Sequence, residues 1–169
     1  MSATRRVPSQ VLVALQFVLV FALVLATRWP VPSKAWPFTL LLLAVAVVLG
    51  VWTLGHNRWG NFNIRPELRS GARLVTGGPY RRIRHPMYTS LLLGMGALVV
   101  ADARPWRIAL LVALLVVLML KAAREEEYLR AAFPDYAAYA SRTWRLVPFI
   151  YRRTTAIRRR RPRFSTCDR

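Results

Sequence analysis

Four stretches of this chain are apolar on every side, and no other feature of the sequence constrains its fold as much. They are residues 11–27, 35–54, 87–101 and 108–120. A core helix of a soluble protein carries a polar face that repeats about every 3.6 residues, and none of these stretches has one. We therefore expect an all-α integral membrane protein with four transmembrane helices and a C-terminal cytoplasmic amphipathic segment.

The four stretches differ in length. The second is long enough to cross a bilayer alone, whereas the third and fourth fall short of the roughly 20 residues that a span requires. We expect these two to continue into flanking helix or to border a partly wet, protein-lined region. Gln16 is the only strongly polar residue inside the first stretch. That stretch could instead be a cleaved signal peptide, although no A-x-A site follows it, and a soluble bundle is a further alternative.

Basic residues predict the orientation. The formal net charge is +19, from 26 Lys and Arg against 7 Asp and Glu. Of these 26 residues, 22 lie before the first stretch, between the second and third, and after the fourth, and 4 lie in the other two connections. The positive-inside rule then places both termini and the loop 56–86 in the cytoplasm.

The C-terminal residues 152–169 form a basic tail that we expect to be disordered and cytoplasmic. Four of its arginines are consecutive, at 158–161. Near a membrane such a run attracts anionic lipids, and no aromatic platform beside it favours nucleic-acid binding. Cys167 is the only cysteine, which excludes an internal disulfide framework and a cysteine-rich metal site. We expect neither a metal nor a nucleic-acid partner.

Residues 73–88 form the first polar block that could carry chemistry, and they lead directly into the third apolar stretch. Gly77-Gly78-Pro79 predicts a turn, and Pro86 suits the first turn of a helix. His85 and Tyr88 would then lie near the start of that helix, at the membrane boundary. The simplest interpretation is that they anchor a helix end at the interface.

Residues 121–148 form the second block, after the fourth stretch. Lys121 and Glu125 share a helix face because they are four residues apart. The simplest interpretation is a charged helix end followed by an interfacial amphipathic helix, with Leu129, Phe133 and Tyr136 facing lipid. Gly94-Met95-Gly96 lies inside an apolar stretch, where small residues usually permit close helix packing.

Taken together, the blocks have the pattern L-V-T-x-G-x-Y-x-x-x-R-H-P-x-Y, an apolar hairpin, E-E-x-x-L-x-x-x-F, Y-x-x-Y and R-T-x-R-L-x-P. This order resembles the isoprenylcysteine carboxyl methyltransferase family of integral membrane methyltransferases, which is related to phospholipid N-methyltransferases. The resemblance covers about residues 73–148. It implies one methyltransferase domain over residues 1–151 with a cofactor-binding core at about 73–148.

The resemblance implies bound S-adenosylmethionine on the cytoplasmic side. Glu125 matches the family's cofactor-binding glutamate, and Glu126 is its neighbour in the motif. Lys121 falls where the animal enzymes carry a substrate-contacting arginine, and Arg142 matches the arginine of the closing motif. Ser90 and Trp144 depart from a frequent Gly and a frequent Pro. The other implied cofactor contacts are Leu74, Val75, Tyr80, His85, Pro86, Met87 and Tyr88.

The expected reaction is methyl transfer to a lipophilic small molecule or lipidated acceptor at the membrane interface. If the acceptor is a carboxylate, its charge and that of the cofactor cancel in the transition state, and Arg142 or Lys121 would position it. An amine acceptor would need a base to take its proton. The alternatives are a membrane NADPH-dependent double-bond reductase and a non-catalytic module that binds a lipid or a partner chain.

Overall fold

The computed structural model describes residues 8–27, 33–57 and 73–146, and over these residues the chain is helical with no strand. Each of the four apolar stretches forms one helix, as the sequence predicts. The predicted tail at 152–169 and Pro148 of the closing motif lie outside the described residues. The elements are α1 (Ser9–Leu25), the 3₁₀ turn η1 (Ser33–Ala35), α2 (Trp36–His56), the 3₁₀ turn η3 (Gly78–Arg81), α3 (Pro86–Ala101), α4 (Pro105–Ala132) and α5 (Tyr136–Arg142).

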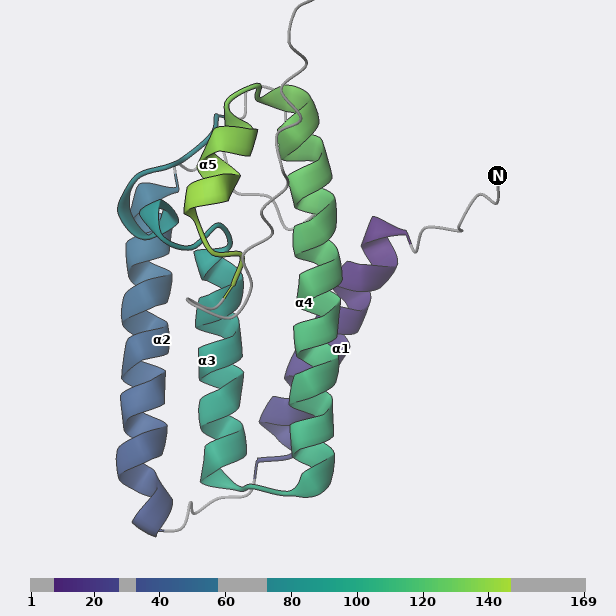
Figure 1. The fold of residues 1–169 in the computed structure, drawn as a ribbon. Coiled ribbons are helices and arrows are strands. Elements are labelled where there is room, and N and C mark those ends of the chain that lie inside the picture. Colours follow the sequence, from purple (N-terminus) through teal and green to yellow (C-terminus); the bar gives the residue numbers. More distant parts are fainter. Residues whose placement is uncertain (1–7, 28–32, 58–72, 147–169) are drawn as a thin grey trace, which may run out of the picture.

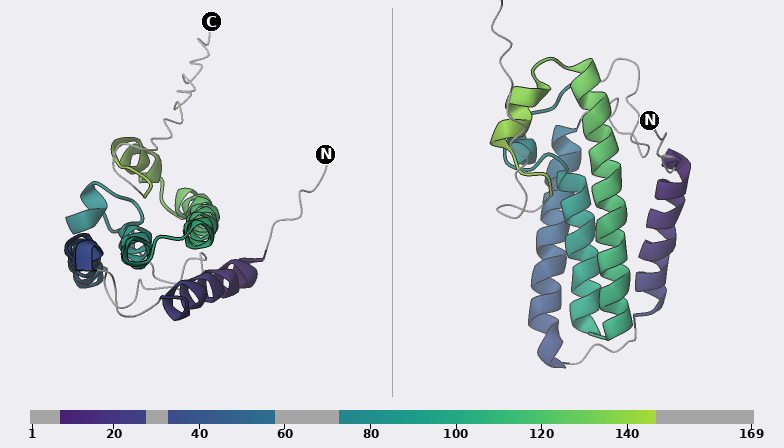
Figure 2. Two further views of the ribbon diagram at one scale, coloured as in Figure 1. Left: turned by 90° about the horizontal axis from the view of Figure 1, so that it is seen from below. Right: turned by 45° about the vertical axis from the view of Figure 1, so that its right-hand side comes forward.

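The four long helices form a bundle in which α3 packs between α2 and α4 (Figure 1). Helix α1 packs mainly on α4 and also contacts α3, as the two views in Figure 2 show. The end of α2, the start of α3 and the end of α4 lie at one end of the bundle, together with α5 and η3. We call this the α5 end.

Two helices are long and apolar enough to cross a membrane. Helix α2 has 21 residues and a mean hydropathy of 2.4, and α4 has 28 residues and a mean hydropathy of 2.2. Helix α2 exposes most of its apolar side chains; Val47 and Val51, for example, are 62% and 64% exposed. Helix α4 also exposes apolar side chains, such as Val112 and Val116. Helices α1 and α3 are apolar but have only 17 and 16 residues, so four crossings stay a prediction.

The third and fourth apolar stretches are short, and the structure shows how far the helices that contain them extend. Helix α4 continues beyond residue 120 to Ala132, as expected, and it therefore carries Lys121, Glu125 and Glu126 on one continuous helix. Helix α3 gains only Pro86 beyond its apolar stretch. These three polar residues of the second block are thus held by the same helix that packs in the bundle.

Helix α1 is an integral part of the bundle core. Its residues Leu12, Leu19 and Leu23 are buried in one cluster with Leu114 and Leu118 of α4. Lipid is as apolar as leucine, so in a bilayer these contacts hold α1 against α4 by close van der Waals packing rather than by removing leucine from water. This packing favours a permanent helix over a cleaved signal peptide.

Small residues bring α2 and α3 together. A Cβ atom at Gly50 would lie 2.9 Å from the Ser90 hydroxyl, which itself donates to the Ala46 carbonyl at 2.8 Å. Gly94 also faces α2, where its Cβ position lies 3.8 Å from the Ala46 side chain. Gly96 does not take part, because nothing lies within 4 Å of its Cβ position. The predicted packing role therefore holds for Gly94 and is wrong for Gly96.

The end opposite α5 is closed by Arg107, whose side chain is fully buried. Its guanidinium donates to the Thr27 hydroxyl at 2.7 Å and to the Leu23 carbonyl of α1 at 3.3 Å. It also lies 3.1 Å from the Asp102 carboxylate, and a hydrogen bond from Arg104 lowers the pKa of Asp102. Arg107 therefore joins α1 to the α3–α4 turn.

Candidate functional site

The two polar blocks of the sequence pair with each other through their backbones. Ile83 and Trp144 form an isolated parallel bridge. The Arg84 amide donates to the Trp144 carbonyl at 2.7 Å, and the His85 amide donates to the Arg145 carbonyl at 3.1 Å. This short pairing places the side chains of Arg84, His85 and Arg145 at the end of α4.

A tight turn at Gly78 precedes His85 and directs the chain toward the start of α3. Gly78 has a φ of +54°, a conformation that glycine adopts without strain, and a Cβ atom there would collide with the His56 ring. The following chain ends at His85, which caps α3, and Pro86 occupies the first turn. The predicted turn and the predicted helix start are both confirmed.

Glu126 is the centre of a charged cluster, in which Glu126, Arg84, His85 and Arg145 are buried and Arg130 is exposed at the surface. Its fully buried carboxylate accepts hydrogen bonds from Arg145 Nε at 2.9 Å and Nη2 at 2.8 Å. Arg130 donates to the same carboxylate at 3.0 Å. Arg84 Nη1 and His85 Nε2 lie 3.5 and 3.4 Å from Oε1. Both oxygens of Glu126 therefore already have protein partners.

Glu125 differs from its neighbour because its side chain is 21% exposed. The Tyr88 hydroxyl donates to Oε1, and His85 Nδ1 lies 3.0 Å from Oε2. The His85 and Tyr88 rings stack, with centroids 5.5 Å apart and planes 9° from parallel. Burial lowers the pKa of His85, but hydrogen bonds to Glu125 and Glu126 outweigh it, so the net shift is upward.

Lys121 lies one turn before Glu125 and is only 1% exposed. Its ammonium donates to Gln16 Oε1 of α1 at 2.6 Å and lies 5.2 Å from the centroid of the Tyr88 ring. Lys121 and Glu125 thus share the helix face that the sequence predicts, since both meet Tyr88. Among the described residues no ion pair joins the two.

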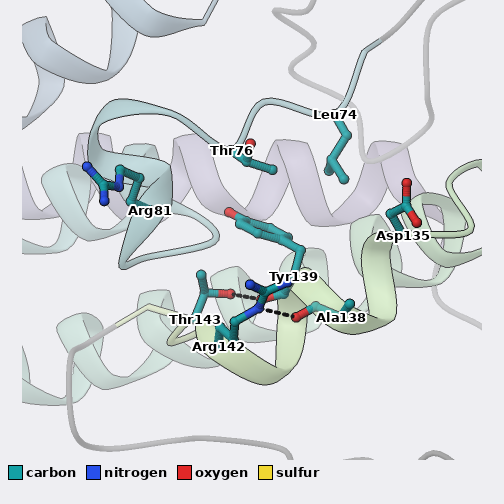
Figure 3. Close-up of a pocket in the computed structure, with 8 residues that line it drawn as sticks. All are labelled: Leu74, Thr76, Arg81, Asp135, Ala138, Tyr139, Arg142 and Thr143. Carbon is teal, nitrogen blue, oxygen red and sulfur yellow. Dashed lines mark hydrogen bonds between the residues drawn. The ribbon is translucent and has the colours of Figure 1, made fainter.

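A pocket of about 600 Å³ lies between residues 74–81 and α5, and its lining residues are distinct from those of the charged cluster. Figure 3 shows Leu74 and Thr76 on one wall and Tyr139, Arg142 and Thr143 on the other. The remaining lining residues are Arg81, Asp135 and Ala138. The pocket therefore offers cationic, anionic, hydroxyl and apolar groups within one cavity.

Tyr80 connects the pocket to the carboxylate cluster. Its carbonyl accepts a hydrogen bond from the Tyr139 hydroxyl at 2.8 Å. Burial, with a further contribution from the charge of Glu125, raises the pKa of Tyr80 to about 12. Burial also raises the pKa of Tyr139. Both phenols therefore stay protonated at neutral pH.

The structure groups the predicted site residues in two sets. His85, Tyr88, Lys121, Glu125 and Glu126 converge at the end of α4, whereas Leu74 and Arg142 line the pocket. Pro86 is buried at the helix start, and Val75 and Met87 are half-buried. These assignments as cofactor and acceptor contacts stay predictions. The interpretation that Tyr136 faces lipid is wrong, because its side chain is fully buried within the protein.

Sequence reasoning missed three residues of the site. Arg145, three residues after Arg142 in the closing motif, forms the paired hydrogen bonds to Glu126. Arg84 precedes His85 and is buried against the same carboxylate. Gln16 stands out in the sequence as a lone polar residue in an apolar stretch. Nothing in the sequence indicates that it forms a hydrogen bond with Lys121, 105 residues away.

Comparison with known proteins places the chain in a family. The phospholipid methyltransferase family model matches residues 34–136, more than half of the chain, from α2 to the start of α5. The cobalt-zinc-cadmium resistance protein CzcN of Cupriavidus metallidurans is 34% identical over 128 residues. That match covers 60% of this chain and 58% of the relative, so the chain spans less than two thirds of the relative's length. With its two apolar spanning helices, the chain belongs to the phospholipid methyltransferase family of integral membrane methyltransferases.

Proposed function

We propose that this chain transfers a methyl group from S-adenosylmethionine to a lipophilic acceptor at the membrane surface. The observation that carries the proposal is the partly exposed Glu125 carboxylate, fixed by Tyr88 and His85 at the α5 end of the bundle. Ionisable groups near membrane depth are energetically costly, and their presence there marks candidate functional residues. Family membership supports methyl transfer over the reductase alternative.

The residues present suit this cofactor chemically. A cofactor with a carboxylate, an ammonium, ribose hydroxyls and an aromatic base needs partners of several kinds. Glu125 would accept from hydroxyl or ammonium groups, while Arg81 complements the carboxylate of the cofactor and leaves Arg142 for the acceptor. Leu74 and Tyr139 offer surface for the base. The cavity volume of about 600 Å³ falls within the usual range for small-molecule sites.

The protein's own contribution would be binding, orientation and exclusion of water. The bound cofactor supplies an electrophilic methyl group on a cationic sulfur. Glu125 is held from two sides before any ligand arrives, so little ordering is needed on binding. His85 and Tyr88 keep this carboxylate in place. Glu126, on the other side of the His85 ring, contacts Nε2 and so helps to fix the orientation of the ring. Alignment of the acceptor accounts for most of the rate in such a displacement.

We propose a carboxylate as the acceptor group, with an amine as the alternative. Arg81 and Arg142 give the pocket two cations against the single carboxylate of Asp135. Guanidinium groups bind carboxylates with paired hydrogen bonds. An acceptor with an apolar tail would approach from the bilayer, because α2 and α4 expose apolar side chains along their length.

We also propose that the basic residues 152–169 bind anionic lipids, at about 1 kcal/mol per basic residue near the surface. Deletion of residues 153–169 tests this. The truncated protein should lose binding to vesicles that contain phosphatidylserine and keep its affinity for S-adenosylmethionine. A large loss of cofactor affinity would contradict the proposal that the tail takes no part in cofactor binding.

Binding measurements on detergent-purified protein test the main proposal. Calorimetry with S-adenosylmethionine and with NADPH, run side by side, should show binding of the first and none of the second. The opposite result would favour a reductase, and binding of neither would favour a non-catalytic membrane module. With radiolabelled cofactor and a membrane extract, alkali should release volatile methanol from a methyl ester but not from a methylated amine.

A further inference from the structure

We infer that Gln16 is a positioning residue that holds the Lys121 ammonium away from Glu125 and so keeps the Glu125 carboxylate available to the cofactor. The inference rests on the proposed function and extends the site to α1. Helix α1 lies outside residues 34–136, the part of the chain that the family model matches. The contact is therefore a feature of this chain that family membership does not supply.

The geometry of the Gln16–Lys121 pair is that of a strong hydrogen bond. Lys121 Nζ lies 2.6 Å from Gln16 Oε1, and the lysine side chain is almost fully buried. Gln16 stands in the interior of a helix that is otherwise apolar between Val11 and Leu25. An uncompensated amide in such a place is costly, so its pairing with an ammonium explains why it is tolerated.

Helix geometry offers Lys121 a different partner. Residues four apart on a helix are neighbours, and an opposite charge at that spacing normally attracts a lysine. Yet Glu125 is bonded to Tyr88 and His85, and the Lys121 ammonium lies over the Tyr88 ring, 5.2 Å from its centroid. The Lys121 ammonium therefore has Gln16 and the Tyr88 ring as its partners, where helix geometry alone would predict Glu125.

Loss of the Gln16 oxygen has a specific consequence. The buried ammonium then needs a new acceptor, and Glu125 is the nearest carboxylate on its own helix face. An ion pair with Lys121 would withdraw Glu125 from the cofactor. The defect in a Gln16 variant therefore comes from the lysine, and removal of the lysine charge should correct it.

The test is a suppressor experiment on the full chain in detergent. Gln16→Leu should weaken S-adenosylmethionine binding about tenfold, the usual effect of disturbing a hydrogen bond to a charged group. Gln16→Glu, which keeps an acceptor oxygen, should bind like the wild type. Gln10→Leu is the matched control, because Gln10 lies on the same helix but is exposed. It should also bind like the wild type.

The decisive variant combines Gln16→Leu with Lys121→Met. It should recover most of the affinity that Gln16→Leu alone loses, because no ammonium remains to pair with Glu125. A purely structural role of Gln16 predicts no recovery, since the apolar substitution is still present. Wild-type affinity in Gln16→Leu, or a double variant that binds no better than the single one, would overturn the inference.

The wild-type protein distinguishes failure of the proposed function from failure of the inference about Gln16. If the wild type does not bind S-adenosylmethionine, the proposed function is wrong, and unfolding temperatures then decide the inference. Gln16→Leu should lower the unfolding temperature of the protein that contains Lys121 and should have a clearly smaller effect when Lys121→Met is present. Equal effects in both backgrounds would show that Gln16 does not hold Lys121.

Discussion

Arg145 binds Glu126 with two hydrogen bonds, from Nε at 2.9 Å and from Nη2 at 2.8 Å, although 19 residues separate them in the chain. This contact fastens the segment after α5 to the end of α4. The backbone of Arg145 in turn accepts a hydrogen bond from the His85 amide. This ion pair therefore helps to hold His85 beside the partly exposed carboxylate of Glu125.

The first prediction concerns the stability of this cluster. Glu126→Gln should lower the free energy of unfolding by about 3 to 5 kcal/mol, because it leaves the buried Arg84 and Arg145 without their counter-charge. Denaturant titration in detergent measures the loss. Glu127→Gln, at an exposed position of the same helix, should change stability by about 1 kcal/mol or less. Equal losses in the two variants would contradict the central role of Glu126.

The second prediction separates cofactor binding from stability. Glu125→Gln keeps the side-chain volume but removes the charge, and it should weaken S-adenosylmethionine binding by about 1.5 to 3 kcal/mol. Its unfolding temperature should stay closer to that of the wild type than that of Glu126→Gln. Calorimetry measures the affinity, with Glu127→Gln as the control. Unchanged affinity would remove Glu125 from the cofactor site.

The third prediction is a pH dependence that comes from His85. Hydrogen bonds to Glu125 and Glu126 raise its pKa in the folded protein. The unfolded value is about 6.5, so this stabilisation is complete below about pH 6.5 and is lost as the pH rises through the folded pKa. Unfolding temperatures measured across this range should therefore fall with rising pH. The fall should be smaller in His85→Gln and should persist in His56→Gln.

The fourth prediction concerns the α2–α3 contact. Gly50→Ala places a Cβ atom 2.9 Å from the Ser90 hydroxyl, which is tied to the Ala46 carbonyl and cannot move without losing that hydrogen bond. The variant should unfold at a lower temperature than the wild type. Gly96→Ala is the matched control because its Cβ meets nothing within 4 Å. It should keep or gain stability, by about 0.5 to 1 kcal/mol from helix propensity.

The fifth prediction tests the orientation in the membrane. In a Cys167→Ser background, a cysteine at the exposed Lys34 should react with an impermeant maleimide added to intact cells. A cysteine at the exposed Arg82, at the α5 end, should react only after the cells are permeabilised. The expectation follows from the excess of basic residues on that side. External labelling at position 82 would reverse the orientation.

Local sequence patterns are enough to locate the helices and the two polar blocks. Helical hydropathy is a local property, so the apolar stretches marked α1, α2 and α3 and the start of α4 to within a few residues, and Pro86 marked the start of α3. Helix α4 continues to Ala132, beyond the apolar stretch that ends at residue 120. The spacing of four between Lys121 and Glu125 was enough to put both on one helix face. Family-like motifs at both blocks were also visible in the sequence alone.

The contacts among the polar residues, in contrast, depend on how the helices pack. The bond between Gln16 and Lys121 and the pairing of Arg145 with Glu126 join different elements of the chain, and no local pattern encodes such contacts. The same holds for the two glutamates, which are neighbours in sequence. Adjacent helical residues point about 100° apart. Packing therefore buried Glu126 among arginines and left Glu125 partly exposed.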